Sequence, residues 1–268
     1  MLYSLGALDT TGSITQLGRQ IASFPLDPPQ ARAIVESTKH SSTSSLVSVL
    51  SLLSASGKIF HASKDNTAAL EAYAKFRHRS GDHLTLLNVL RAYEQVINKT
   101  PATKHTVVEM DGPGDSTPSG RQWCKNNFLN ERALKEAINI RKQLRESCER
   151  ERINWGASVP VNPDGDEKDD EGVLKSLLTG FWQYTATIAP DGTYRQVVGH
   201  QVRITIPRSP KAKIDEISQP VKIHPSSALF GRKCPAIMYH ELVSLPSDRN
   251  CQVMTPFPYS SSLQTLMP

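Results

Sequence analysis

The hydrophobic pattern of the chain changes from helical to strand-like near residue 172, and this change restricts the fold more than any other feature. Before it, apolar residues recur every three or four positions, as on one face of a helix. After it come four short segments rich in aromatic and β-branched residues, at 181–188, 194–198, 219–223 and 237–243. Helices and strands that are segregated along a chain predict an α+β protein, here a helical bundle followed by a small β domain.

The stretch 76–93 (FRHRSGDHLTLLNVLRAY) predicts the central helix of the bundle. Gly81 is a break, and the Asp82 carboxylate is expected to cap the free N–H groups of the first turn over 82–93. Further helices are expected from Asp27-Pro28 onward, and over 46–53, 66–77 and 123–152. Short loops between amphipathic helices favour an antiparallel arrangement.

Changes in composition divide the chain into segments. Residues 1–26 contain a turn that leads into a short strand, and 27–156 form the bundle. Within the bundle, 95–121 is rich in proline and glycine and predicts a loop or disordered insertion. Residues 157–172 predict a solvated acidic linker, and 173–268 predict the β domain.

Two arginines, Arg141 and Arg145, fall on the apolar arc of the expected helix 123–152. Burying an unpaired guanidinium costs on the order of several kcal/mol, so each needs a partner. One explanation is an internal ion pair with a carboxylate of the bundle. The other is a groove in which the two side chains meet phosphate groups.

Composition sets broad limits on function. The chain has 268 residues, a net charge of +5 and 21% charged residues, which is compatible with a polyanionic partner. No apolar run approaches the ~20 residues of a membrane-spanning helix, and no secretory signal is visible. The four cysteines form no CxxC pair, so structural zinc is not expected.

Motifs for nucleotide chemistry are missing from the sequence. No G-x-x-x-x-G-K-[ST] loop occurs, and the pair Gly57-Lys58 lacks the glycine loop that would precede it. GxSxG and HExxH are absent as well. We therefore expect no catalytic residue, metal site or cofactor site in this chain, and no ATPase activity of the chain alone.

Five sequence blocks resemble the C-terminal region of DEAH-box ATP-dependent RNA helicases, in the same order. They are LGALDxxGxxTxLGRxxAxFPLDP (5–28), GDHxTLLN (81–88), WCxxNF (123–128), IRKQL (140–144) and IHPSS (223–227). The resemblance covers most of residues 1–240. It implies that 1–26 is the end of a winged-helix domain, that the bundle is the ratchet-like helicase-associated domain, and that the β domain is an OB-fold.

The resemblance also implies a function. This would be an accessory region that binds the backbone of single-stranded RNA and helps to couple unwinding to RecA-like motor domains absent from this chain. ATP and Mg²⁺ would be bound only by those domains. The implied partners are single-stranded RNA, the motor domains and a protein activator, with no membrane. The implied compartment is the nucleus or nucleolus, and otherwise the cytoplasm.

Candidate RNA contacts are carried over from the matching motifs. His83 is a candidate RNA contact, although a local hydrogen-bonding role is the alternative. His224 is another, although it could instead anchor a turn at the end of a strand. The full set of candidates is Arg141, Arg145, His83, Asn88, Lys222, His224 and Ser226.

Two alternatives to an RNA-binding region stay open. The chain could be a protein-interaction scaffold that binds no RNA, or a truncated gene-model fragment without function. The basic stretch 202–218 has no counterpart in the family, which indicates either a retained intron or a real loop. The tail after Val243 also departs from the family, so the last strand of the barrel has no clear sequence counterpart.

Overall fold

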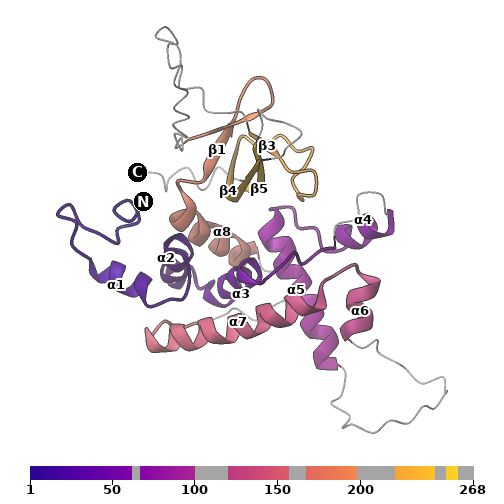
Figure 1. Ribbon diagram of the computed structural model, residues 1–268, viewed down its shortest axis with the longest axis horizontal. Helices are drawn as coiled ribbons and strands as arrows, with labels where there is room; N and C mark the ends of the chain where they lie inside the picture. Colours follow the sequence, from indigo (N-terminus) through magenta and orange to yellow (C-terminus); the bar gives the residue numbers. More distant parts are fainter. Residues whose placement is uncertain (62–66, 100–119, 157–166, 198–220, 245–251, 259–268) are drawn as a thin grey trace, which may run out of the picture.

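The computed structural model describes residues 1–61, 67–99, 120–156, 167–197, 221–244 and 252–258. Within these ranges, eight α-helices come first in the sequence and five β-strands follow. The helices form a bundle, and the strands form a separate curled sheet at one side of it (Figure 1). The expected α+β class, with helices before strands, is confirmed.

The helices of the described residues are α1 (Gln16–Ala22), α2 (Pro28–Ser37), α3 (Thr43–Ser54), α4 (Thr67–Ala74), α5 (Asp82–Lys99), α6 (Gly120–Asn126), α7 (Glu131–Arg150) and α8 (Glu167–Phe181). Helices α2, α3, α4 and α5 lie close to their expected positions. A 3-10 turn at Thr38–His40 follows α2. As expected, Asp27 is the N-cap residue of α2 and proline occupies the first turn, where a missing N–H has no consequence.

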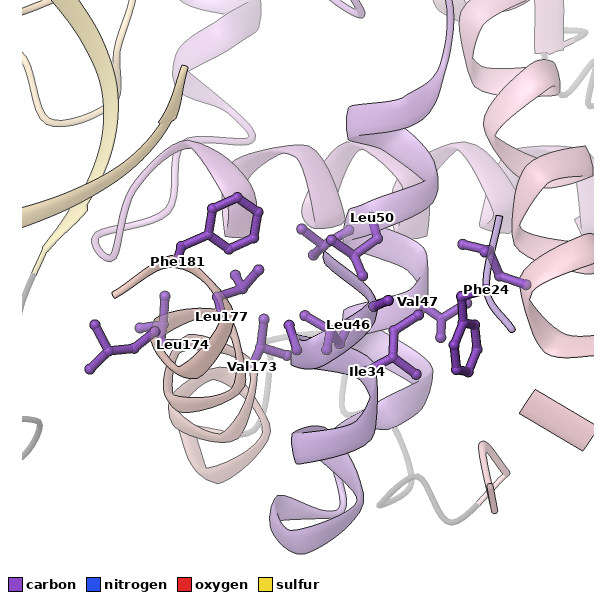
Figure 2. Packing of buried hydrophobic residues seen from close by; sticks show 14 of the residues in the cluster. Phe24, Ile34, Leu46, Val47, Leu50, Val173, Leu174, Leu177 and Phe181 are labelled. Atoms are coloured by element: carbon purple, nitrogen blue, oxygen red, sulfur yellow. The ribbon is translucent and has the colours of Figure 1, made fainter. Parts of the chain in front are cut away.

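Helix α3 is the centre of the bundle. It packs against α2, α5, α7 and α8, and almost all of its residues are buried. Figure 2 shows Leu46 and Leu50 of α3 facing Ile34 of α2 and Val173 and Leu177 of α8. Leucine and valine make up half of the α3 sequence, TSSLVSVLSLLS. Buried serines fit among them because their hydroxyls donate to carbonyls of the same helix, as Ser48 does to Ser44 and Ser51 to Ser48.

A second hydrophobic cluster joins α5, α6 and α7. It includes Val89, Leu90 and Tyr93 of α5, Cys124 of α6 and Leu134 of α7. All five side chains are almost fully buried. Helices α3, α5 and α7 contribute side chains to both clusters.

The strands form a curled sheet that closes on itself. The strands are β1 (Thr185–Ile188), β2 (Tyr194–Gln196), β3 (Val221–Ile223), β4 (Ala236–Ser244) and β5 (Gln252–Pro258). Neighbouring strands β3, β2, β1 and β4 pair antiparallel in that order. Strand β5 pairs antiparallel with β4 and parallel with β3, which closes the ring in the order β1-β2-β3-β5-β4.

Alternation along the strands determines which side chains fill the ring. Val221 and Ile223 of β3 point inward and Lys222 between them is exposed. Tyr194, Ile237 and Tyr239 add to the same interior. The turn expected at 190–193 is confirmed: Thr193 donates its backbone N–H and its hydroxyl to the Asp191 carboxylate, and Gly192 has a φ of +81°.

One expected helix is broken in two. The prediction of a continuous helix over 123–152 is wrong at residues 127–130, between α6 and α7. Phe128 adopts a φ of +55°, and the N–H of Leu129 bonds back to the Cys124 carbonyl at 2.9 Å, which ends α6. Asn130 then caps α7 by accepting the N–H of Ala133.

Three further segments differ from expectation. The strand expected near residue 14 is a single bridge between Leu8 and Ile14, and the following residues form α1 instead. Phe181, expected in a strand, ends α8. The acidic residues from 167 onward, expected in a solvated linker, form the first turns of α8; residues 157–166 lie outside the described residues.

Other expectations fall partly or wholly outside the described residues. The insertion expected over 95–121 is helical at both ends, where α5 reaches Lys99 and α6 begins at Gly120. Residues 100–119 and the basic stretch 202–218 are outside the described ranges. The tail after Val243 does contribute a strand, β5, which no pattern in the sequence clearly predicts.

Helix α8 approaches α2 closely enough to exclude a side chain at one position. A Cβ on Gly180 would lie 2.0 Å from the backbone oxygen of Pro29 and 3.4 Å from the Cβ of Ala33. The obstructing atom belongs to the backbone of α2, so it cannot turn away as a flexible side chain would. The contact therefore fixes the distance between the two helices.

We expect Gly180→Ala to lower the free energy of unfolding by about 1–3 kcal/mol, because α2 and α8 must separate to admit the methyl group. This loss should exceed the gain of about 1 kcal/mol that alanine brings to a helix. Urea unfolding measures the difference. Gly156→Ala is the control, since the nearest atom to its new Cβ is 3.8 Å away. A Gly180→Ala chain as stable as wild type would contradict the close approach.

Candidate nucleic-acid interface

The bundle and the curled sheet meet at the first residue of α5. The Asp82 carboxylate accepts the backbone N–H of Ala228 at 2.6 Å and the Tyr73 hydroxyl at 3.2 Å. The expectation that Asp82 caps its own helix is therefore corrected. The helix does begin at Asp82, but this carboxylate satisfies a backbone donor in the segment after β3.

Two arginines strengthen the same junction. Arg77, between α4 and α5, donates its Nε to the carbonyl of Ala228 at 2.9 Å. Arg232 donates Nη1 to the carbonyl of Arg79 at 2.9 Å. In the first hydrogen bond the donor belongs to the bundle, and in the second it belongs to the sheet. Ala228 thus has both of its backbone polar groups held by side chains of the bundle.

Burial raises the pKa of Asp82 above its ordinary value of 3.8, and hydrogen bonds from Ala228, Ser227 and Tyr73 offset only part of the shift. Asp82 in turn contributes to raising the pKa of Tyr73, after burial, so this phenol stays protonated and able to donate. The junction is therefore held by a carboxylate in a partly dry environment, where its hydrogen bonds are strong.

His83 lies inside the junction. Its side chain is 1% exposed, and its ring packs edge to face on His240 of β4 with 5.4 Å between centroids. Burial, with His240 as a smaller cause, holds the pKa of His83 well below its usual value, so the ring is neutral. A side chain so buried offers no surface to RNA in this conformation, and the position of His83 instead favours the local role.

Asn88 is also engaged inside the bundle. It is partly buried on α5 and donates its side-chain amide to the carbonyl of Phe76 at 3.2 Å. This bond ties the middle of α5 to the end of the segment after α4. In the described structure Asn88 therefore orders the α4–α5 corner that carries the junction arginines.

Arg141 of α7 forms an internal ion pair, the first of the two explanations offered for it. Its guanidinium donates both terminal nitrogens to the carboxylate of Glu94 on α5, Nη1 at 3.2 Å, and its side chain is 11% exposed. Nη1 also lies 3.4 Å from the Ser48 hydroxyl of α3. The side chain thus connects three helices.

Arg145 is stabilised in a different way. Its guanidinium carbon lies 4.5 Å from the centre of the Trp155 ring, a cation–π contact. Burial and the neighbouring Arg141 lower its pKa, and Glu94 partly offsets this. Among the described residues the Nε of Arg145 has no hydrogen-bond acceptor. Figure 1 places α7 across the bundle from the strands, so Arg141 and Arg145 are separated from the candidates on the sheet.

The three candidates on the sheet lie together on the segment that reaches the junction. Lys222 is exposed on β3. His224 anchors the turn after β3: its Nδ1 lies 2.6 Å from the Ser226 hydroxyl and accepts the Ser226 N–H at 3.1 Å. The turn continues directly to Ala228, so His224 and Ser226 position the backbone that Asp82 and Arg77 hold.

A group of cations that the sequence did not single out surrounds this turn. Arg77 and Arg79 from the bundle and Arg232 and Lys233 from the sheet are all exposed. Phe230, 53% exposed, lies beside them in the chain. We call these five residues the junction surface. The runs RHR at 77–79 and GRK at 231–233 are visible in the sequence, but 151 residues lie between them.

The acidic start of α8 is also part of the bundle. Asp169 pairs with Arg91 of α5 at 3.0 Å and accepts the Ser45 hydroxyl at 2.6 Å. Asp170 lies 3.1 Å from Nε2 of His78. Both carboxylates are therefore engaged with residues of the helical bundle.

No metal or membrane site emerges from the part of the chain that the structure describes. Among those residues there is no group of three His, Cys, Asp or Glu side chains that could hold a metal ion. None of the helices described is both long and apolar enough to cross a bilayer.

Comparison with known proteins first defines a class. The family described as "Helicase associated domain (HA2), winged-helix" matches residues 1–26. A helicase-associated region is thus the class that the N-terminal segment indicates, and the helical bundle follows it directly in the chain.

Two curated relatives then make the family specific. The chain is 31% identical over 245 residues to the ATP-dependent RNA helicase DHX33 of Drosophila melanogaster, covering 90% of this chain and 28% of the relative. It is 29% identical over 242 residues to the human ATP-dependent RNA helicase DHX33, covering 89% and 28%. The chain spans little more than a quarter of the length of these relatives. The matches show that the chain corresponds to a C-terminal region of DEAH-box RNA helicases.

The folded-state pKa of Asp82 lies above its unfolded value, so the folded chain holds this proton more tightly. The resulting stabilisation is complete below the unfolded pKa and is lost as pH rises through the folded pKa. Asp82→Asn cannot titrate. We therefore expect the stability of wild type relative to Asp82→Asn to increase as pH falls from about 7 to about 4 in urea unfolding experiments.

Asp191→Asn is the control for this pH series. The pKa of the exposed Asp191 is lowered, chiefly by the Thr193 hydroxyl, so its contribution is lost as pH falls. The stability of wild type relative to Asp191→Asn should therefore decrease as pH falls over the same range. If the relative stability changed with pH in the same direction for both variants, the assignment of a raised pKa to Asp82 would be refuted.

The Arg141–Glu94 pair can be measured with a double-mutant cycle. We expect Arg141→Ala and Glu94→Ala to be coupled by about 0.5–3 kcal/mol in unfolding free energy, because the pair is partly buried and bidentate. The exposed pair Lys175–Glu171, four residues apart on α8, should show a coupling of about 0.3–0.5 kcal/mol. Equal coupling in both cycles would mean that Arg141 contributes no more than a surface ion pair.

Proposed function

We propose that the chain is an accessory region of a DEAH-box RNA helicase that binds the backbone of single-stranded RNA. The observation that carries this proposal is the junction surface, where exposed cations from the bundle and from the sheet meet around one rigid turn. Both relatives are named as RNA helicases, which supports RNA as the polyanion. Contacts to phosphates give affinity that depends on salt and not on sequence.

The curled sheet is proposed to be an OB-fold. Its five short strands form a closed ring in which β5 returns to lie between β3 and β4, as expected for a small Greek-key barrel. The proposed division of the chain is then a winged-helix end at 1–26, a ratchet-like bundle from 27 and the barrel from 173. Helix α8 packs within the bundle, however, so we place the beginning of the barrel proper at β1.

Within this proposal the candidate residues have different tasks. Lys222 and the junction surface contact phosphates, while Phe230 offers an exposed ring on which a base can stack. His224 and Ser226 shape the turn. His83, Asn88, Arg141 and Arg145 are positioning residues in the free chain, because internal contacts occupy their side chains.

The remaining features of the proposal concern the whole protein. RecA-like motor domains would bind ATP and Mg²⁺ and drive unwinding, and this region would couple the held strand to their motion. A protein activator is a further proposed partner, and the nucleus or nucleolus is the proposed compartment. A basic region without a nucleotide motif is suited to binding the RNA strand, because binding requires no catalytic residues.

The test is fluorescence anisotropy of labelled oligo-uridine against the purified chain at several salt concentrations. We expect binding that weakens steeply as salt rises. The variant Arg79→Ala/Lys222→Ala/Lys233→Ala spares Arg77 and Arg232, whose side chains hold the junction. It should reduce the slope of log affinity against log salt by about 2, since each lost phosphate contact contributes about 0.7.

A control variant removes the same charge elsewhere. Arg19→Ala/Lys39→Ala/Lys142→Ala changes exposed side chains on or near α1, α2 and α7. It should leave the slope close to that of wild type. If the two variants lower the slope equally, the junction surface is not the binding site. If a folded chain binds no RNA even at low salt, RNA binding is refuted and a protein-binding scaffold becomes the better description.

A further inference from the structure

A second basic surface lies where α6 meets α7, across the bundle from the strands (Figure 1). It is a hollow of about 750 Å³, within the range of ligand sites in proteins. Arg121 and Lys125 of α6 and Arg132 of α7 line it, and all three are exposed. Asn126 and Asn130 also line the hollow.

Glu131 is the acidic residue of the hollow, and cations already neutralise it. Lys135 contacts its Oε1 at 2.7 Å, and Arg121 lies 3.8 Å from its Oε2. Lys125 and Arg132 are in no ion pair with a described residue. The hollow therefore carries a net positive charge and favours an anionic group.

The aromatic residue of this hollow is held in an unfavourable backbone conformation. Phe128 has a φ of +55°, which is common for glycine and rare for a bulky residue. Its backbone does have a structural task, because its carbonyl accepts the N–H of His61 at 2.9 Å. Phe128 also lines the hollow, and its side chain is not part of the hydrophobic clusters formed by the described residues.

A glycine at position 128 would serve the backbone equally well. Helices often end on a residue in this left-handed conformation, and glycine adopts it without strain. Strained residues persist where the rest of the structure requires them, and they gather at functional sites. The ring is the one part of Phe128 that the helix end does not explain.

We propose that this hollow binds one nucleotide unit of a single strand, with the base stacked on Phe128 and the phosphates held by Arg121, Lys125 and Arg132. The inference rests on the proposed function, because it takes single-stranded RNA as the ligand. A simple anion would need the cations but not the ring. An aromatic residue beside cations matches a nucleotide, which presents a flat base and a charged phosphate together.

The main test is Phe128→Gly, which removes the ring and fits the left-handed backbone. Urea unfolding should show a stability close to that of wild type, because relief of strain opposes the greater freedom of glycine when unfolded. Affinity for oligo-uridine should nevertheless fall about 5- to 100-fold, as expected for loss of one stacked base. An unchanged RNA affinity would overturn the proposal.

An abasic strand separates stacking from charge. Phe128→Gly and wild type should bind an abasic oligonucleotide of the same length with equal affinity, since no base remains to stack. Lys125→Ala/Arg132→Ala should weaken binding of both strands and lower the salt slope by about 1.4. Lys142→Ala, on the same helix beyond the hollow, should leave the affinity and the salt slope close to those of wild type. If Phe128→Gly weakens the abasic strand as much as the natural one, the ring does not stack on a base.

A free nucleotide carries the same base and phosphate, so it could occupy the hollow in place of one unit of a strand. Uridine monophosphate at millimolar concentration should not compete with the strand, because one unit alone lacks the neighbouring phosphates. Competition at micromolar concentration would overturn the assignment to a strand. These outcomes differ from failure of the proposed function, in which no RNA binds to any variant; binding that depends on the junction surface but not on Phe128 would overturn this inference alone.

Discussion

The hydrogen bond from the Ala228 N–H to the Asp82 carboxylate is the contact on which the arrangement of the molecule depends. It joins Asp82, the first residue of α5, to the turn that follows β3. A charged acceptor at 2.6 Å in a partly dry site makes a stronger bond than two neutral groups would. Arg77 completes the arrangement by donating to the carbonyl of the same residue, so both sides of one peptide are held. The exposed cations around the turn are consequently presented on a fixed frame.

Sequence patterns predicted the elements of this fold better than their ends. Periodicity located α2, α3, α4 and α5 and most of the strands, because burial of one face imposes a visible spacing. It failed at Phe128, where no glycine marks the left-handed helix end that separates α6 from α7. It also failed at the start of α8, because acidic residues that seem solvated in a sequence can pair with distant partners such as Arg91.

The candidate site shows the same limit in another form. The block GDH was recognised as important, but the expected reason was helix capping, whereas Asp82 bonds to a residue 146 positions away. For Arg141, apolar periodicity correctly showed that a partner was required, and Glu94 is that partner. The junction surface could not be found from local patterns, because its two halves are joined only by the folded chain. Long-range polar contacts leave no period in a sequence, so they have to be read from the structure.

The apolar interiors of the bundle and the sheet are not separate. Met238 of β4 packs in the helical cluster, and Tyr184, between α8 and β1, contacts that cluster as well as the interior of the ring. Helix α8 ends at Phe181 and β1 begins at Thr185, so only three residues lie between the two architectures. A connection so short, with side chains shared across it, cannot serve as a hinge. The bundle and the sheet should therefore unfold in one cooperative step. An RNA strand bound at the junction would contact one rigid unit, not two parts that move independently.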